Sequence, residues 1–370
     1  MTTVASRLTP RPTAVGALRE RVVKFAERLT TPLVPADYLD VIDPLRSGAN
    51  LRGRIVAIHP ETRDAVTIMI KPGRGWRPHV PGQYVRIGVD VAGVRQWRAY
   101  SLTSKTHRRD GCIAITVKAI PDGVVSNHLV RRATVGTVVQ LDQAAGEFTL
   151  GDRPPRKILF ITGGSGITPV MGMLRNMVGL HDQAPDVVVV HSAPTLEDVI
   201  FYGELHMLAR RGRIRLVEKH TDTDGMLDAT RLEELVDDFA ERATWACGPA
   251  GLLDALEHRY AADGIADRLH IERFRPTVIT AGEGGTVTFA KTGTVVDAGG
   301  SQTLLDAGEA AGVLMRSGCR MGICFGCVTP LRQGAVRDLR NGDLTTASAG
   351  DNVQIQTCVS AAAGACELDI

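Results

Sequence analysis

The sequence predicts a multidomain protein of the α/β and β classes, with an antiparallel β-barrel, a parallel α/β domain and a small C-terminal domain that carries a metal cluster. Three observations support this fold class. Short β-rich runs follow Leu51, strands alternate with helices after Pro154 and Pro155, and four cysteines near the C-terminus are spaced C-x4-C-x2-C…C. The length of 370 residues also exceeds what a single hydrophobic core supports.

The composition is that of a globular protein and argues against several classes of partner. The net charge of +2 is too small to indicate binding to nucleic acid or to an anionic membrane surface. No apolar run is long enough for a transmembrane segment, and the first residues lack the apolar stretch of a signal peptide. Cys112, Cys247 and Cys366 lie outside the C-terminal motif and form a poor disulfide framework. We therefore predict a cytoplasmic protein.

Residues 1–50 form an N-terminal extension of mixed charge. Apolar residues recur at spacings of three and four over 14–30, which predicts an amphipathic helix. We expect its apolar face to pack on the body of the protein. Docking of this face to a partner or to a membrane surface is the alternative.

Residues 51–152 contain the β-rich runs of the predicted barrel, and one of its strands closes with the sequence RAYS. Arg98 offers a cation for a phosphate, Tyr100 an aromatic face for a flavin ring, and Ser101 a hydrogen-bond donor near the reactive edge of that ring. The pattern R-x-Y-S also occurs in ordinary strands, so it does not establish a flavin site alone.

A second segment of the barrel domain, GVVSN, strengthens the flavin interpretation. Gly123, Ser126 and Asn127 stand where a helix is expected to begin, and backbone N–H groups at such an end can receive a phosphate. Together with Arg98 this gives two phosphate sites, which predicts FAD rather than FMN.

Residues 153–275 alternate strands with helices, as expected of a parallel sheet. The apolar strand ILFI leads into GGSGITP, where Gly163, Gly164 and Gly166 precede a helix that we expect to begin at Thr168. A glycine-rich turn at a helix start lets the backbone approach a pyrophosphate. The sequence is not the G-x-G-x-x-G fingerprint, and a tight turn without a ligand is the alternative.

A second candidate for the dinucleotide site lies at Cys247 and Gly248. They end what we take to be the last strand of the parallel sheet, at the carboxyl edge where ligands of such sheets bind. Cysteine is also a common small buried apolar residue, which is the alternative interpretation of Cys247.

Residues 276–283 are glycine- and threonine-containing and are expected to link the α/β domain to residues 284–370, the cluster domain. The spacing of the cysteines is that of plant-type [2Fe–2S] proteins, in which three thiolates come from one loop and the fourth from further along the chain. A zinc site or a set of buried thiols is the alternative, but zinc motifs usually show paired C-x2-C units or histidines. The predicted cluster ligands are Cys319, Cys324, Cys327 and Cys358.

Taken in order, RAYS, GVVSNHL, GGSGITP, CGP, IERF and the cysteine loop resemble the ferredoxin–NADP reductase superfamily, in the subgroup with a C-terminal plant-type ferredoxin domain. The resemblance covers roughly residues 51–370. It implies a flavin-binding β-barrel, a nucleotide-binding α/β domain and a C-terminal β-grasp ferredoxin domain. With the N-terminal extension included, the chain is most similar to actinobacterial reductases that supply electrons to membrane acyl-CoA desaturases.

The resemblance also implies roles for individual residues. Arg98 would bind the flavin phosphate, Tyr100 would stack on the flavin ring and Ser101 would lie near its N5 atom. Cys247 would sit beside the hydride-bearing carbon of the nicotinamide. The pyrophosphate of FAD would be held by Gly123, Ser126 and Asn127, and the nicotinamide dinucleotide by residues 163–168. Glu272 and Phe274 match the segment that closes the nicotinamide side.

These features predict an enzyme that takes a hydride from NADPH and passes single electrons through FAD and a [2Fe–2S] cluster to an oxygen-activating partner, a membrane acyl-CoA desaturase. A ring-hydroxylating or other oxygenase is the alternative partner. An electron-carrier module without NAD(P)H turnover of its own is the alternative of another class. Ser192, Lys219 and His220 can meet a 2′-phosphate and favour NADPH, with NADH as the alternative coenzyme.

Overall fold

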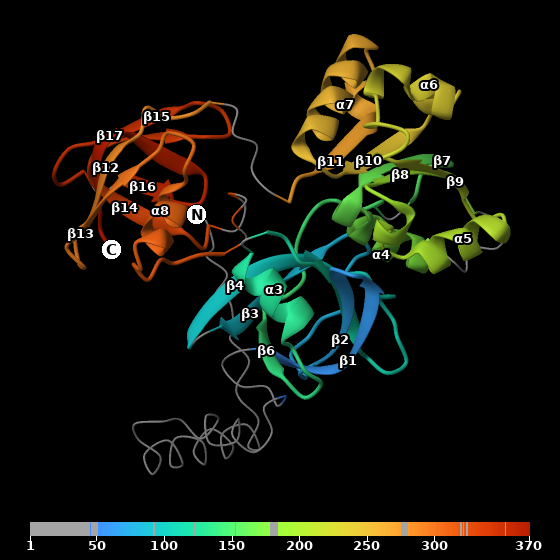
Figure 1. The fold of residues 1–370 in the computed structure, drawn as a ribbon, viewed down its shortest axis with the longest axis horizontal. Coiled ribbons are helices and arrows are strands. Elements are labelled where there is room, and N and C mark those ends of the chain that lie inside the picture. The colour runs from blue at the N-terminus through green and yellow to red at the C-terminus, as the bar shows by residue number, and fades with distance from the viewer. Residues whose placement is uncertain are drawn as a thin grey trace, which may run out of the picture.

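The computed structural model of this chain describes residue 45 and residues 51–370, except residues 92, 122, 152, 178–183, 275–279, 319, 321, 323–324 and 352. The amphipathic helix predicted over 14–30 therefore lies outside the described residues. The described strands form three sheets, in three successive parts of the chain (Figure 1).

The first sheet is antiparallel and closes into a barrel. Its strand order is β4-β3-β6-β1-β2-β5, and a bridge between Leu102, just after β4, and Ile115 in β5 joins its two edges. Ile68, Ile87 and Ile115 are fully buried inside it, as expected for the inward positions of alternating strands. The elements are β1 (Arg52–Thr62), β2 (Ala65–Pro72), β3 (Tyr84–Val91), β4 (Val94–Ser101), β5 (Ile113–Lys118), α3 (Val124–Arg131) and β6 (Val138–Leu141).

The second sheet is parallel, with the strand order β11-β10-β7-β8-β9. Its central strands β7 and β8 are almost wholly buried, which explains why their sequences are continuous apolar runs rather than alternating ones. The elements are β7 (Lys157–Gly163), α4 (Ile167–Met177), β8 (Asp186–Ala193), α5 (Tyr202–Arg210), β9 (Arg215–His220), α6 (Leu232–Leu235), β10 (Ala243–Cys247), α7 (Ala250–Ala262) and β11 (Leu269–Glu272).

Two details of this sheet differ from the sequence expectation. A further strand, β11, follows β10 and pairs with it, so CGP does not end the last strand. This strand has only four residues and no continuous apolar run, which left no periodic signal. The helix expected from Thr168 begins at Ile167, because a 3₁₀ turn over Gly164–Gly166 connects β7 to α4.

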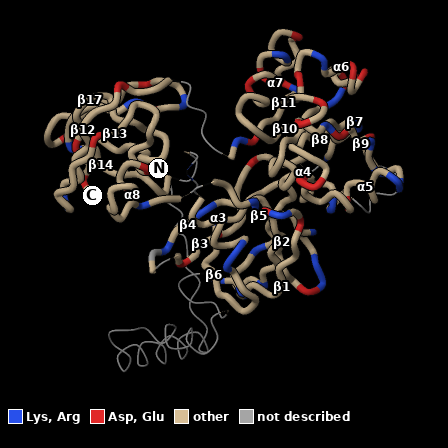
Figure 2. The backbone as a smooth tube through the Cα atoms, in the orientation of Figure 1, with Lys and Arg blue, Asp and Glu red and all other residues tan. Residues whose placement is uncertain are grey.

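The third sheet is mixed, with β12 parallel to β17 and the other described pairs antiparallel. The path of the sheet is β13-β12-β17-β14-β15, and β16 pairs with β14. The elements are β12 (Gly285–Phe289), β13 (Thr294–Ala298), α8 (Leu304–Ala310), β14 (Val328–Asp338), β15 (Leu344–Ala347), β16 (Val353–Gln356) and β17 (Ser360–Leu368). The three architectures confirm the predicted fold class. Charged residues of both signs are interspersed over all three (Figure 2).

Candidate functional site

The end of β4 brings together the first group of predicted residues. β4 pairs with β3 so that Ser101 opposes Tyr84 and Arg98 opposes Ile87. The Ser101 side chain is buried, and its Oγ has no hydrogen-bond partner within the described part of the chain. A buried hydroxyl without a partner is costly, so this position fits a bound group that supplies one. Burial raises the pKa of Tyr100, which keeps its phenol neutral.

Arg98 is half-buried and bonds to neutral oxygens, its Nη1 donating to the Trp97 carbonyl at 2.8 Å and its Nη2 to Gln96 Oε1 at 3.4 Å. Burial, and then the positive charge of Arg320, lower the pKa of Arg98 to about 10. Among the described residues no carboxylate pairs with this guanidinium. A largely desolvated cation whose direct bonds are to neutral oxygens fits the binding of an anion such as a phosphate.

Side chains from the first turn of α3 bond back to backbone carbonyls that precede the helix. Ser126 Oγ donates to the carbonyl of Gly123 at 3.2 Å, and Asn127 Nδ2 donates to the carbonyls of Ile120 and Gly123, each at 2.8 Å. A Cβ on Gly123 would collide with Ser126 Oγ. These side chains therefore shape the helix start, and the groups left to meet a phosphate are the backbone N–H groups.

The predicted dinucleotide residues lie together at the carboxyl edge of the parallel sheet. A Cβ on Gly166 would collide with the carbonyl oxygen of Cys247, and one on Gly163 would lie 2.6 Å from Pro249 Cδ. A Cβ on Gly248 would lie 3.0 Å from the Gly163 nitrogen. The turns after β7 and β10 thus pack backbone against backbone, which only glycine permits.

Two further residues complete this turn. Gly164 has a φ of +52°, in the left-handed region that favours glycine. Thr168 Oγ1 donates to the Ser165 carbonyl at 2.9 Å, so this hydroxyl closes the turn onto α4. The arrangement leaves a surface of glycine backbone at a helix N-terminus, which suits an anionic ligand.

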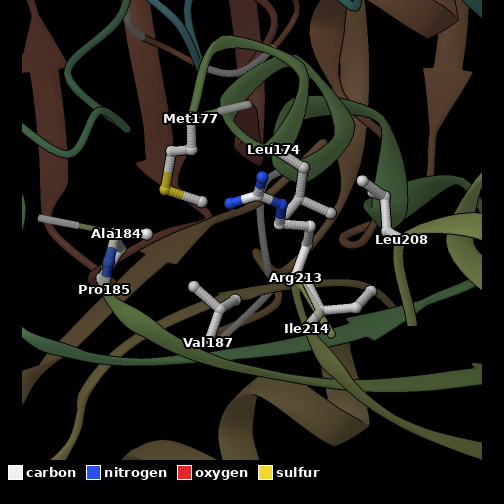
Figure 3. Close-up of a pocket in the computed structure, with 8 residues that line it drawn as sticks. All are labelled: Leu174, Met177, Ala184, Pro185, Val187, Leu208, Arg213 and Ile214. Atoms are coloured by element: carbon white, nitrogen blue, oxygen red, sulfur yellow. The ribbon is translucent and has the colours of Figure 1, made fainter. Parts of the chain in front are cut away.

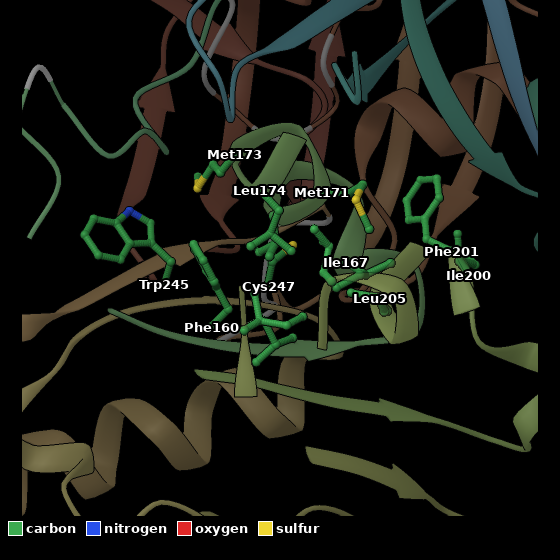
Figure 4. Packing of buried hydrophobic residues seen from close by; sticks show 14 of the residues in the cluster. Phe160, Ile167, Met171, Met173, Leu174, Ile200, Phe201, Leu205, Trp245 and Cys247 are labelled. Carbon is green, nitrogen blue, oxygen red and sulfur yellow. The ribbon is translucent and has the colours of Figure 1, made fainter. Parts of the chain in front are cut away.

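Cys247 and Glu272 end neighbouring strands, in register with each other. Cys247 is fully buried in the apolar core that lies under α4 (Figure 4). Its burial, with the charge of Glu272, raises the pKa of the thiol well above its ordinary value. Burial likewise raises the pKa of Glu272 to about 8, and its Oε2 has no hydrogen-bond partner within the described residues. Burial at this edge therefore favours the neutral form of both groups.

The neighbouring strand ends carry a histidine that the sequence analysis passed over. His191 in β8 is buried, and its Nδ1 lies 2.8 Å from Thr162 Oγ1 in β7. Burial, and then the charge of His220, lower the pKa of His191 to about 4, so the ring is neutral at pH 7. In the same register Ser192 opposes Lys219. In the sequence, the only sign of this histidine was that two polar residues, His191 and Ser192, follow the apolar run of the strand.

The C-terminal domain brings two of the predicted cluster cysteines together. Cys327 and Cys358 are buried, and their Sγ atoms lie 3.2 Å apart, while Cys319 and Cys324 lie outside the described residues. In the described part of the chain no group of three or more His, Cys, Asp or Glu is placed to hold a metal. The chemistry of the thiol pair fits a soft metal centre.

Three side chains bond to the backbone of the loop that carries Cys327. The carbonyl of Gly322 accepts hydrogen bonds from Arg340 Nη1 at 3.2 Å and from Gln356 Nε2 at 2.9 Å. Thr357 Oγ1 donates to the Cys327 carbonyl at 3.1 Å. Neither Arg340 nor Gln356 was identified from the sequence, because both lie far along the chain from the loop they contact.

Two hollows among the described residues lie away from these groups. One cavity of about 30 Å³, lined by Leu174, Val187 and Leu208 among others, lies under α4 and α5 (Figure 3). A groove of about 320 Å³ on the outside of the barrel is lined by Arg52, Arg95 and neighbouring residues. Neither contains a predicted site residue. No described helix is long and apolar enough to cross a membrane.

The sequence matches three protein families in turn. Residues 78–150 match the oxidoreductase FAD-binding domain, 160–258 the oxidoreductase NAD-binding domain, and 287–363 the 2Fe-2S iron-sulfur cluster binding domain. The chain therefore carries binding domains for FAD, for a nicotinamide dinucleotide and for a [2Fe–2S] cluster, the cofactors that the sequence analysis predicted.

Relatives that match most of the chain support this assignment. An NADPH oxidoreductase of Mycobacterium tuberculosis is 48% identical, over 98% of this chain and 96% of its own length. The glycine betaine monooxygenase reductase subunit of Pseudomonas aeruginosa is 30% identical, over 75% of this chain and 84% of its own length. The structure of phthalate dioxygenase reductase shares the fold with a TM-score of 0.61 at 23% identity, over 87% of this chain and 98% of that one.

Proposed function

This chain belongs to the ferredoxin–NADP reductase-type family of flavin and iron–sulfur oxidoreductases, and from that premise we propose that it carries electrons from NADPH through FAD and a [2Fe–2S] cluster to an oxygen-activating partner. A bound flavin would supply the chemistry that links the two-electron nicotinamide couple to a one-electron cluster. The chain's own task is to orient these groups and to keep water away from them.

One observation supports this path above the others. Asp306 and Glu309 of α8 pair with Arg320 of the cysteine loop, and the charges of all three act on Arg98 at the end of β4. The strand proposed to hold the flavin and the loop proposed to hold the cluster are therefore neighbours. Electron transfer from flavin to cluster needs this proximity.

In the flavin site, we assign Arg98 to the phosphate, Tyr100 to the face of the ring and Ser101 to its N5 edge. The phosphate role of Arg98 is supported by its guanidinium, which bonds to neutral oxygens. The role of Ser101 is supported by its Oγ, which has no hydrogen-bond partner among the described residues. Ser126 and Asn127 fold the start of α3, so that backbone N–H groups beside Gly123 face the second phosphate of FAD.

In the dinucleotide site, the turn over Gly163, Gly164 and Gly166, closed by Thr168, is assigned to the nicotinamide dinucleotide. Cys247 and Gly248 form the wall against which this turn packs. The buried thiol of Cys247 is neutral and small, which suits a position beside an uncharged ring. The proposed ligands of the cluster are the four cysteines of the motif, Cys319, Cys324, Cys327 and Cys358.

We assign NADPH as the coenzyme. Ser192 and Lys219 end adjacent strands in register, with His220 following, and together they can meet a 2′-phosphate. The nearby carboxylate of Asp224 accepts a hydrogen bond from the His220 backbone nitrogen at 2.9 Å. This bond holds the carboxylate against the turn that follows β9. The name of the Mycobacterium tuberculosis relative, NADPH oxidoreductase, agrees with this assignment.

The proposed partner is a membrane acyl-CoA desaturase, on the strength of the resemblance of the whole chain to desaturase reductases. Residues 284–370 contain six Lys or Arg and eight Asp or Glu, a near-neutral balance that suits weak and transient contacts. A soluble oxygenase is the second candidate, favoured by the relative that serves as a glycine betaine monooxygenase reductase subunit.

Reconstitution with each partner tests the assignment. Membranes that contain an acyl-CoA desaturase, supplied with oxygen, saturated acyl-CoA, NADPH and this protein, are expected to form unsaturated acyl product. The same assay with NADH should give a lower kcat/KM for the coenzyme. No product there, together with turnover of a soluble ring-hydroxylating oxygenase, would overturn the desaturase assignment.

A further inference from the structure

The barrel and the parallel sheet meet at a junction formed by residues 102–106, the segment that directly follows β4, and the C-terminal half of α4. α4 approaches so closely that a Cβ on Gly172 would collide with the carbonyl oxygen of Leu102. On the other side of the same contact, a Cβ on Gly82 would lie 2.6 Å from Met173 Cε. The two parts are therefore in direct backbone contact here.

Arg175 crosses this junction. Its Nη1 donates to the carbonyl of Thr103 in the barrel at 2.6 Å. Its other two nitrogens form a bidentate ion pair with Glu204 of α5, with Nη2 at 2.6 Å from Oε2 and Nε at 3.0 Å from Oε1. The ring of Phe201 lies 4.8 Å from the guanidinium carbon. Phe201 has a φ of 64°, and this left-handed backbone places its ring at the guanidinium.

Asn176 adds a second set of bonds to the same segment. Its Oδ1 accepts from the Thr106 nitrogen at 3.0 Å and from Thr106 Oγ1 at 3.1 Å. Its Nδ2 donates to the carbonyl of Ser104 at 3.3 Å and to that of Gly172, in α4 itself, at 2.7 Å. Both the oxygen and the nitrogen of the Asn176 amide are thus used in joining the end of α4 to the barrel.

The two ends of α4 serve different parts of the site. Its N-terminus carries the Gly164–Gly166 turn assigned to the dinucleotide, and its last turn bonds to the chain that directly follows Tyr100 and Ser101. The helix has 11 residues, which spans about 16 Å at 1.5 Å per residue. We propose that Arg175 and Asn176 are positioning residues, which fix the flavin strand relative to the dinucleotide turn so that nicotinamide and flavin are held at the separation hydride transfer needs.

This inference rests on the proposed order of electron flow, from nicotinamide to flavin. The transfer moves one hydride, two electrons with one proton, from the nicotinamide to the flavin, and Arg175 takes no part in that chemistry. Its effect comes from geometry, because reacting atoms must approach to about 3–3.5 Å and a shift of about 1 Å costs about a hundredfold in rate. The proposed flavin-to-cluster step would instead run past Arg98 and its charged neighbours Arg320, Asp306 and Glu309, none of which belongs to α4.

Arg259 offers a matched control. Its guanidinium pairs with carboxylates too, here two of them, Asp263 at 2.7 Å and Glu233 at 3.0 Å. It also donates to the backbone carbonyl of Thr230 at 2.5 Å and lies 5.1 Å from the ring of Phe239. The side chains of Arg259 and Arg175 are equally exposed, at 19%. These partners of Arg259 all belong to the parallel-sheet domain, so its removal loses similar contacts without touching the junction.

The experiment compares Arg175→Ala, Arg175→Lys, Asn176→Ala and Arg259→Ala in the full-length holoenzyme by stopped-flow reduction of the flavin with NADPH. Arg175→Ala is expected to lower the limiting rate of flavin reduction by about tenfold or more, since its effect is on alignment, while the Kd for NADPH changes by less than about threefold. Arg175→Lys keeps one donor for Thr103 and should recover part of the rate. Arg259→Ala should leave the rate unchanged.

Hydrogen exchange gives a readout that needs no coenzyme. The amides of residues 103–107 should exchange faster in Arg175→Ala and Asn176→Ala than in Arg259→Ala, since only the first two lose bonds to this segment. If Arg175→Ala does not fold, Asn176→Ala, which keeps the ion pair, carries the same test. A flavin-reduction rate in both variants equal to that of Arg259→Ala would overturn the inference. Failure of the unaltered protein to reduce its flavin with NADPH would instead overturn the proposed function.

Discussion

The dinucleotide turn and the cysteine loop are both glycine-rich, but they are built in opposite ways. The turn after β7 is defined by backbone packed on backbone, with Gly166 against the Cys247 carbonyl and Gly163 against Pro249. In the cysteine loop, Arg320 and Phe325 adopt left-handed φ values of 60° and 55°, a conformation that costs about 1–3 kcal/mol at each non-glycine residue.

This difference separates two ways of making a binding site. The dinucleotide turn needs only its own backbone neighbours, and so we expect it to keep its shape before any ligand binds. The cysteine loop is held by side-chain bonds from Arg340 and Gln356 to the Gly322 carbonyl, and its strained residues need a further source of energy. Thiolate bonds to a bound cluster would supply that energy, so we expect the loop to depend on its metal.

Removal of one proposed cluster ligand should give the largest effect. Cys327→Ser replaces a soft thiolate with a harder oxygen ligand, and we expect loss of the cluster absorbance and of electron transfer to a one-electron protein acceptor. Reduction of ferricyanide through the flavin should survive, since the dinucleotide turn is independent of the loop. Absorbance spectra and the two acceptor assays measure these effects.

Cys366→Ala is the control for this variant. Cys366 is buried within β17, paired with Gly334 and Val287 outside the ligand spacing, and its loss should leave the cluster absorbance intact. A parallel fall of both acceptor activities in Cys327→Ser would contradict the sequential path from flavin to cluster.

The turn should instead be broken by adding a side chain. In Gly166→Ala the new Cβ meets the Cys247 carbonyl, a backbone atom that cannot rotate away. We expect a loss of about 1–3 kcal/mol in the free energy of unfolding, the usual cost of overpacking, with weaker NADPH binding and an unchanged cluster spectrum. Denaturant titration and coenzyme titration check this.

Gly251→Ala provides the matched substitution. Gly251 lies in α7, and a Cβ added there would have no described neighbour within 4 Å. Alanine at this position should stabilise the helix slightly, by about 0.5–1 kcal/mol. Equal effects of the two substitutions would show that the Cys247 contact does not define the turn.

The same contrast explains what the sequence could predict. The glycine turn, the RAYS strand and the cysteine spacing are local patterns, and so the fold class and the cofactors followed from them. Contacts made by side chains far apart in the chain left no such signal: Arg175 reaches Thr103 across 72 positions, and Arg340 reaches Gly322 across 18. The sequence did not predict β11, because four residues carry too little periodicity. The burial of the Glu272 carboxyl, at the end of this strand, was therefore not predicted either.

Glu272 supplies the last prediction, which concerns the pH dependence of stability and tests whether the carboxyl beside the proposed dinucleotide site is uncharged. Burial raises its pKa to about 8 in the folded protein, whereas an unfolded chain has a glutamate pKa of about 4.3. Between these values the folded state keeps a proton that the unfolded state has released. The contribution of this proton to the free energy of unfolding is therefore complete below about pH 4 and is lost as the pH rises through about 8.

Glu272→Gln cannot ionise, so its Tm should fall less between pH 5 and pH 8 than that of the unaltered protein. Glu257→Gln, at a surface carboxylate that pairs with Arg273 at 2.8 Å, should keep the original slope. Parallel Tm profiles for Glu272→Gln and the unaltered protein would mean that this carboxyl is charged in the folded state, and that the edge beside Cys247 is open to water.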